Sequence, residues 1–268
     1  MIDFEPIDNE RFAQLAGVHY DCEYSATAPL CYGITHRLRH HFGKMRTLGR
    51  IVLIADYSDD SADKEFVDSV PENVQAIFAT NADHEHSRLH PIPIGLHYSR
   101  EREQRLVEHS KAGPLKREKL MYVNFFRDIP RPSKPRVGLY EMFGGLEWVT
   151  CKGGGLDNRI PQEEFYLDLR RHDYALSPPG AGPDCHRHWE AMALGCIPVV
   201  LRSKATEGLL ADMPALLVDD WGEVTKERLG DSLPKLRERF SWPSMRKLDF
   251  NYWKEKINHA VDRLRNPA

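Results

Sequence analysis

The sequence has no long hydrophobic run and no large excess of charge of one sign. Nowhere in its 268 residues do about 18 consecutive apolar residues occur, the length that a membrane-spanning helix needs. The 37 Lys and Arg residues nearly balance the 40 Asp and Glu residues, and the formal net charge is −3. This balance gives no general attraction to an anionic polymer. We therefore expect no transmembrane segment and no nucleic-acid partner, whereas peripheral contact with a membrane through a local basic patch stays open.

Cysteine is scarce and follows no metal-binding or disulfide pattern. The five cysteines are odd in number and include no Cys-x-x-Cys pair, so neither a cysteine zinc site nor a disulfide framework is expected. The N-terminal stretch MIDFEPIDNERF has no basic region followed by an apolar run, so we do not expect a secretory signal. These absences predict free thiols and a soluble cytoplasmic enzyme.

Internal repeats and low-complexity segments are also absent, so the architecture has to be inferred from apolar periodicity. Short apolar runs of strand length recur along the chain, and a helix-like stretch, residues 161–172, lies between two of them. Strands that alternate with helices indicate an α/β protein with a largely parallel sheet. The predicted strands are Ile51–Ala55, Val74–Ala79, Ile92–Leu96, Leu120–Phe126, Leu146–Val149, Tyr174–Leu176, Ile197–Leu201 and Ala215–Val218.

A charged stretch, Ser99–Lys119, separates two groups of predicted strands. Its Ala-Gly-Pro break favours a connection between domains over an exposed surface helix. We therefore predict two domains, residues 1–112 and 113–268. Near the C-terminus a last helix is expected, because Trp253 and Ile257 belong to an apolar stripe that needs burial against the body.

The most informative segment is Tyr174–Val200, which reads as a strand, a loop rich in Pro and Gly, a helix and a second strand. Ligands of open parallel sheets bind where such loops lead into helix N-termini, whose free N–H groups and dipole favour anions. Gly182 lets a ligand approach the backbone, and Asp184 stands where an N-cap is expected. Arg187 offers a forked, charged donor, and Glu190 an acceptor for ribose or sugar hydroxyls. This pattern favours a nucleotide diphosphate over a bare metal ion.

The same spacing also allows a purely structural role. Arg187 and Glu190 are three residues apart, the spacing of a pair on a solvated helix face. The loop lacks the third glycine of a dinucleotide-binding fingerprint, so an NAD site has little support.

This segment resembles the donor-binding motif of exostosin-like glycosyltransferases and related GT-B enzymes. A Pro-x-Gly-x-Gly loop is followed by His-Arg-x-Trp-Glu-Ala and then by Gly-Cys-Ile-Pro-Val-Val, residues 195–200, which is the most specific part. The later stretch ALLVDDW, residues 215–221, is also similar to the strand and turn that come next in that family. The resemblance covers about residues 120–230 and leaves the N-terminal part, which looks shortened, without a match.

The resemblance implies an α/β, GT-B-like fold in which two Rossmann-like parallel-sheet domains face each other across a cleft. It further implies transfer of a hexosyl or pentosyl group from a nucleotide-sugar donor to a glycan or glycolipid acceptor, as in polysaccharide biosynthesis, with inversion preferred. No cofactor and no metal are expected, since basic side chains and a helix N-terminus neutralise the departing diphosphate in such enzymes. The absence of Asp-x-Asp, the metal motif of the other major glycosyltransferase fold, agrees with this expectation.

Donor-binding residues are predicted in three loops. Arg127 follows a predicted strand at a place that contributes to the pyrophosphate site in GT-B enzymes, although a surface arginine would look the same. Lys152 precedes a run of three glycines, which is also typical of a plain turn. The full predicted set is Asn124, Arg127, Lys152, Gly182, Asp184, His186, Arg187 and Glu190.

The proton acceptor for the acceptor hydroxyl is predicted to be Asp83, with His84, Asp56 and Asp21 as rivals. Asp83 follows a predicted strand and begins the sequence Asp-His-Glu-His, which we expect to line the cleft. His-x-His can also hold a metal, but the spacing fits no defined metal site.

Three other functions stay open at this stage. One is a sugar-nucleotide epimerase of the same fold, which would isomerise the donor without an acceptor. The second is a binding module that keeps the nucleotide pocket without catalysis. The third is a metal hydrolase built on the histidine-rich loop.

Overall fold

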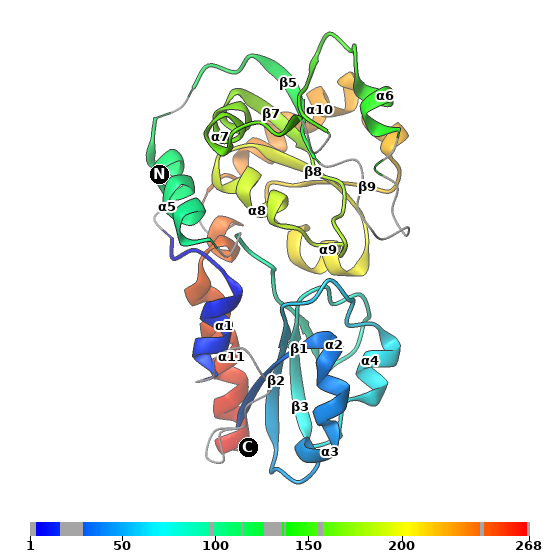
Figure 1. The fold of residues 1–268 in the computed structure, drawn as a ribbon, viewed down its shortest axis with the longest axis vertical. Helices are drawn as coiled ribbons and strands as arrows, with labels where there is room; N and C mark the ends of the chain where they lie inside the picture. Colours follow the sequence, from blue (N-terminus) through cyan, green and yellow to red (C-terminus); the bar gives the residue numbers. More distant parts are fainter. Residues whose placement is uncertain are drawn as a thin grey trace.

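The chain folds into two parallel β-sheets, one above the other, each covered by helices (Figure 1). The computed structural model describes residues 4–16, 29–96, 99–113, 115–125, 136, 138–154, 158–241 and 244–266. Arg127 and Asp21 lie outside the described residues. Among the described residues, no helix combines the length and the apolar character that crossing a bilayer demands.

The first sheet has four parallel strands in the order β1-β2-β3-β4. Its strands are β1 (Leu30–Ile34), β2 (Ile51–Asp56), β3 (Val74–Ala79) and β4 (Leu89–Pro91). The helices between them are α2 (Thr35–Leu38), η1 (Arg39–His41), α3 (Phe42–Met45) and α4 (Lys64–Ser69). The other face is covered by α1 (Asn9–Leu15) and α11 (Phe250–Arg265), which come from opposite ends of the chain (Figure 1).

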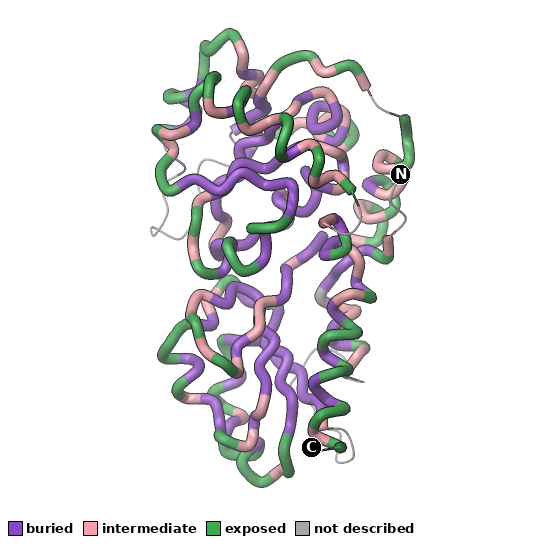
Figure 2. Tube along the Cα trace, turned by 180° about the vertical axis from the view of Figure 1, so that it is seen from behind, coloured by how far each residue is buried: buried purple, intermediate pink, exposed green. Residues whose placement is uncertain are grey.

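Strand β2 shows why this sheet is buried on both faces. Successive side chains of a strand point to opposite sides. Leu53 packs into a cluster with Phe42 and Phe66, whereas Ile54 belongs to a cluster that also contains Trp253 of α11. All six β2 residues are therefore buried, and most of this sheet is coloured as buried in Figure 2.

The second sheet has five parallel strands in the order β6-β5-β7-β8-β9. Its strands are β5 (Lys119–Val123), β6 (Val149–Cys151), β7 (His172–Leu176), β8 (Ile197–Leu201) and β9 (Leu216–Val218). Its helical elements are α6 (Leu139–Phe143), α7 (Gln162–Arg171), α8 (His186–Ala193), α9 (Lys204–Leu210), η3 (Trp221–Glu223) and α10 (Lys226–Glu238). The 3₁₀ turn η4 (Ser244–Leu248) leads into α11.

Helices cover both faces of this second sheet. Residues of α7, α8 and α9 share one buried cluster with Tyr122 of β5, whereas α6 and α10 share another with Met121 of the same strand. Strands β5 and β7 are neighbours in this sheet. After β5 the chain passes to α6 on one face of the sheet, whereas after β7 it passes to α8 on the other face. Such a switch in direction opens a crevice beyond the carboxyl ends of these two strands.

Two segments differ from the sequence-based expectation. Arg100–Lys111 is not a plain connection but a helix of 12 residues, α5, which contacts α7 and α8. The predicted strand at Ile92–Leu96 is wrong, since β4 ends at Pro91 and the next segment leaves the sheet. Its Leu96 N–H donates to Ile7 O (2.8 Å), and Pro93 has no N–H for a ladder.

The C-terminal helix forms as the apolar stripe predicts, with Trp253, Ile257, Ala260 and Val261 buried. It contacts β2 and α1, so the end of the chain packs against the first sheet. The division into residues 1–112 and 113–268 stays a prediction.

Candidate active site

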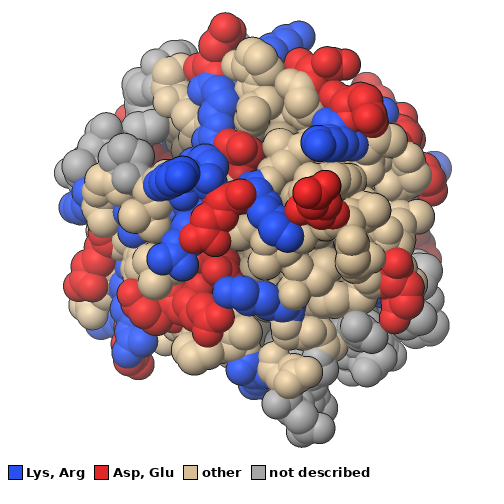
Figure 3. All heavy atoms as spheres, turned by 90° about the horizontal axis from the view of Figure 1, so that it is seen from above, with Lys and Arg blue, Asp and Glu red and all other residues tan. Residues whose placement is uncertain are grey.

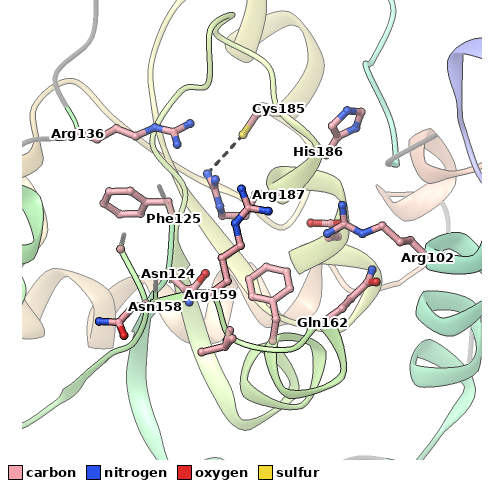
Figure 4. Close-up of a pocket in the computed structure, with 15 residues that line it drawn as sticks. Arg102, Asn124, Phe125, Arg136, Asn158, Arg159, Gln162, Cys185, His186 and Arg187 are labelled. Atoms are coloured by element: carbon pink, nitrogen blue, oxygen red, sulfur yellow. Dashed lines mark hydrogen bonds between the residues drawn. The ribbon is translucent and has the colours of Figure 1, made fainter. Parts of the chain in front are cut away.

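A cavity of about 580 Å³ lies at the carboxyl ends of β5, β6 and β7, where the connections between the strands of the second sheet reverse direction. Four of the predicted donor-binding residues line it: Asn124, His186, Arg187 and Glu190. The other lining residues are Arg102, Phe125, Arg136, Gly153, Gly154, Asn158, Arg159, Ile160, Gln162, Phe165 and Cys185. Figure 4 shows how these side chains surround the same space.

The loop between β7 and α8 is hydrogen-bonded to Asn81, which follows strand β3 of the first sheet. Asn81 accepts a hydrogen bond from the Asp184 N–H (3.0 Å) and donates one to Ser58 O (3.1 Å). A Cβ at Gly182 would lie 2.5 Å from Asn81 Nδ2, so this position has no room for a side chain. Gly182 thus permits contact with Asn81 and does not line the cavity.

Asp184 is buried and has a different role from the expected N-cap. The N-cap of α8 is Cys185, which makes no side-chain capping bond. The Asp184 carboxylate instead accepts hydrogen bonds from Ile94 N–H (2.8 Å) and Trp189 Nε1 (2.9 Å). The sequence misplaced the cap because the backbone partner, Ile94, is distant along the chain. A helix start without a side-chain cap leaves backbone donors for an anion.

Four arginines gather around the cavity: Arg102, Arg136, Arg159 and Arg187. Arg187 Nη1 donates to Pro178 O (3.2 Å), and Arg136 Nε donates to Pro179 O (2.9 Å). Burial and the nearby Arg187 lower the pKa of Arg136 to about 10, so it still carries a positive charge at neutral pH. This concentration of guanidinium groups favours a multiply charged anion.

Glu190 is the one carboxylate among the described residues that line this cavity. It is 6% exposed, and no described residue donates a hydrogen bond to it. Burial raises its pKa, against the opposing effect of His186, Arg102 and Arg187. A buried acceptor without a donor is suited to a ligand that brings hydroxyl groups.

Of the remaining predicted donor residues, Asn124 and His186 line the cavity, whereas Lys152 does not. Asn124 donates through Nδ2 to Lys152 O (3.0 Å), and His186 Nδ1 lies 2.9 Å from Gly95 O. Lys152 Nζ lies 2.9 Å from Glu164 and 2.8 Å from Asp168, and it does not line the cavity. Its charge is therefore already matched within the protein.

Several lining residues carried no signal in the sequence. Arg102 belongs to α5, a stretch that reads as a connection, and Arg159 follows a glycine-rich turn without a motif. Arg136 lies in a segment rich in Arg, Pro and Lys where no single arginine stands out. Only the tertiary structure brings their side chains together.

Asp83, the predicted proton acceptor, lies outside this cavity. The Ala205 N–H of α9 is 3.4 Å from its Oδ1, which places it where the first sheet meets α9. The His84 and His86 rings lie 6.4 Å apart between centroids. Within the described ranges, no three His, Cys, Asp or Glu side chains are grouped to hold a metal ion.

A second polar group lies at the carboxyl edge of the first sheet. Thr35, Asp56 and Thr80 follow or end the adjacent strands β1, β2 and β3, and their buried oxygens have no hydrogen-bond partner among the described residues. Burial raises the pKa of Asp56 to about 7. Tyr57 (φ 53°) and Asn81 (φ 51°) are the described non-glycine residues with positive φ. Such strain often marks functional sites.

Charge on the outer surface is mixed. Figure 3 views the molecule from above, and Lys and Arg side chains there are interspersed with Asp and Glu. That face therefore has no extended field of one sign for a nucleic acid or a membrane.

Comparison with known proteins supports the architecture. No protein-family model matches the chain, and no curated protein matches it significantly. An alpha,alpha-trehalose-phosphate synthase (UDP-forming) from Burkholderia vietnamiensis is similar in structure, with a TM-score of 0.50 and 14% identity. The match covers 88% of this chain and 71% of that one.

Two further solved structures are similar at lower TM-scores. Alpha,alpha-trehalose 6-phosphate synthase from Burkholderia multivorans has a TM-score of 0.49 and 13% identity, over 87% of this chain and 71% of that chain. Sucrose-phosphate synthase from Thermosynechococcus elongatus has a TM-score of 0.47 and 13% identity, over 90% and 74%. The resemblance to exostosin-like enzymes rests on the sequence motif alone. The predicted fold class is confirmed: the chain has a GT-B-like α/β architecture with parallel sheets of four and five strands.

Proposed function

We propose that the protein is a glycosyltransferase that moves a sugar from a nucleotide-sugar donor to a hydroxyl of a glycan or glycolipid. The observation that carries this proposal is the cavity at the switch point of the second sheet. Four arginines, the start of α8 and a buried Glu190 meet there. One solved structure of similar architecture is that of a synthase described as UDP-forming, so UDP-sugars are the first donors to test.

The diphosphate of the donor would lie against Arg187, Arg136 and the first amides of α8. These groups neutralise the charge that develops as the bond between the anomeric carbon and the phosphate oxygen breaks. Because the arginines supply this positive charge, the reaction does not depend on a divalent cation. Arg127, outside the described residues, stays a predicted contributor.

Glu190 would accept hydrogen bonds from ribose or sugar hydroxyls, and Asn124 and His186 would line the donor beside it. Gly182, Asp184 and Lys152 would support the site indirectly. Gly182 and Asp184 fix the loop before α8 through Asn81, and Lys152 presents its carbonyl oxygen to Asn124.

The acceptor hydroxyl would attack the anomeric carbon and lose its proton to a carboxylate, with inversion as the preferred outcome. Asp83 is the proton acceptor predicted from the sequence, and Asp56 is a second candidate. Asp56 is supported by its raised pKa, by oxygens that have no hydrogen-bond partner among the described residues, and by the backbone strain beside it. Its side chain is fully buried, so this role requires that acceptor binding uncover it.

Exchanging each carboxylate for its amide separates the two candidates. Loss of the true proton acceptor should lower kcat by about 100-fold or more while donor affinity stays unchanged. Asp83→Asn and Asp56→Asn would be compared by initial rates and by donor titration. If neither variant loses kcat, both assignments are wrong.

A thermal-shift screen of nucleoside diphosphates and nucleotide sugars, with a chelator present, tests the whole proposal. We expect stabilisation by at least one nucleoside diphosphate, since binding to the folded state alone raises its stability. Stabilisation by none would count against the proposal. Consumption of a bound donor without acceptor, with an isomerised sugar as the product, would indicate an epimerase instead.

A further inference from the structure

We propose that Cys185 is a reactive thiol inside the donor cavity and that its modification by a peroxide or an alkylating electrophile blocks anion binding there. The thiol chemistry rests on local geometry alone, whereas its effect on sugar transfer rests on the proposed function. Cys185 is partly exposed and lines the cavity, so small reagents reach it (Figure 4).

The first argument is that Cys185 is paired with a buried histidine. Cys185 Sγ lies 3.5 Å from His188 Nδ1 and 3.6 Å from His188 Nε2. The His188 ring is held in place by Ser177 Oγ, 2.7 Å from Nδ1, and by Pro183 O, 3.3 Å from Nε2. An imidazole this close to a thiol stabilises the thiolate electrostatically when the ring carries a second proton.

The second argument is the positive charge around the sulfur. Arg187 Nη1 lies 3.7 Å from Sγ, and Arg136 lines the same cavity. Burial by itself would raise the pKa of the thiol, but His188, Arg187 and Arg136 together hold it well below the usual range. The pKa of His188 is raised in turn, chiefly by the thiolate and also by Asp184, against its burial.

The three other described cysteines provide an internal contrast. Cys31 and Cys196 are buried, and burial raises the pKa of their thiols to about 11 and about 12. Cys151 is partly exposed but does not line the donor cavity. Reactivity should therefore be selective for Cys185 over these three.

The chemistry is balanced in both forms of modification. The thiolate attacks one oxygen of hydrogen peroxide, the O–O bond breaks, and the products are a sulfenic acid and hydroxide. Two thiol equivalents reduce the sulfenic acid back to the thiol, with release of a disulfide and water. With iodoacetamide, a C–S bond forms and iodide leaves. Each adduct removes the thiolate and adds atoms beside Arg187, where the diphosphate would bind.

Alkylation by iodoacetamide, followed by peptide mass spectrometry across a pH series, tests the reactivity. We expect Cys185 to be labelled at least about tenfold faster than Cys151 near pH 6, because only a thiolate reacts at a useful rate. His188→Asn should move the pH midpoint of labelling upward, toward the value of about 8.5 of an ordinary thiol. Labelling of Cys185 no faster than that of Cys151 in the folded protein would overturn the proposal.

Pyrophosphate binding, measured by calorimetry before and after peroxide treatment, tests the consequence. We expect the treated protein to lose binding and to regain it after reduction by dithiothreitol, whereas Cys185→Ser should bind pyrophosphate equally before and after treatment. Unchanged binding by a fully oxidised protein would contradict the proposed block. If untreated protein binds no pyrophosphate at all, the proposed function fails, while the labelling rate still decides the reactivity of the thiol.

Discussion

Arg187 and Glu190 begin and end one turn of α8, yet their side chains have different surroundings. Arg187 contacts the carbonyl of Pro178 in the loop before the helix, whereas Glu190 is buried and receives no hydrogen bond from a described residue. They are therefore not a surface ion pair, which was the purely structural alternative. Each side chain should affect a different part of the ligand.

Arg187→Ala should weaken the binding of pyrophosphate and of nucleotide sugars alike, by about 2 kcal/mol for a lost charge-assisted contact. Arg187→Lys should recover part of this, because one ammonium cannot replace the guanidinium fork. Glu190→Gln should lower the affinity for nucleotide sugars and leave the affinity for pyrophosphate nearly unchanged. Calorimetric titration of the folded variants measures all three.

A matched control for these variants is Arg171→Ala. Arg171 ends α7, pairs with Glu118, and does not line the cavity. Its removal should leave both affinities as they are. Equal losses for Arg171→Ala and Arg187→Ala would mean that general charge, and not the position of Arg187, decides binding.

Asp56 should make stability fall as pH rises. Its folded pKa of about 7 is above the ordinary value of 3.8, so the folded state holds the proton more tightly than the unfolded state. This contribution is fully present below the unfolded pKa and is lost as pH rises through about 7, a change of up to about 4 kcal/mol. Asp56→Asn should therefore remove the decline between about pH 5 and pH 8.

Urea unfolding at several pH values measures this effect, with Asp59→Asn as the control. Asp59 is exposed and three residues away, so its exchange should leave the pH dependence of stability unchanged. A parent protein whose unfolding free energy does not fall over this range would contradict the burial of an uncompensated carboxyl.

At the scale of elements, the loop before α8 depends on close contact with the end of β3. Gly182→Ala would place a Cβ 2.5 Å from Asn81 Nδ2, and Asn81 is itself buried and bonded on both sides. We expect a loss of about 1–3 kcal/mol in stability from overpacking. Donor affinity should fall as well, because the start of α8 moves with the loop.

Gly230→Ala is the matched exchange in α10, where an added Cβ meets nothing within 4 Å. Helix propensity should make this variant more stable than the parent by up to about 1 kcal/mol. Thermal unfolding of the two variants side by side checks the contrast. A neutral effect at Gly182 would show that Asn81 can move away.

At the scale of the whole molecule, α11 returns the chain to the first sheet and completes its core. Trp253 is 3% exposed, and its Nε1 donates to Lys247 O (2.9 Å). Trp253→Ala should lower the free energy of unfolding by about 3–5 kcal/mol, as expected for a large buried side chain. Tyr252→Ala, at the less buried neighbouring position, should cost clearly less. Urea unfolding measures both, and equal losses would argue against this packing.

The sequence by itself determined the alternating α/β pattern, the parallel strands and the loop and helix that carry Arg187 and Glu190. These features follow from local chemistry: apolar runs of strand length, Pro and Gly between them, and an apolar helix stripe next to charged residues. Asn124 and His186 were predicted for the same reason, since Asn124 directly follows a strand and His186 begins a helix.

Only the tertiary structure decided which other side chains share the cavity. Arg102, Arg136 and Arg159 come from separate segments, and no local pattern records that their elements meet. Asp184 looked like a helix cap until its partner, Ile94, was brought to it from the first sheet. Lys152 looked like a phosphate ligand until Glu164 and Asp168 matched its charge. Such roles depend on contacts between distant residues, and sequence spacing carries no information about those distances.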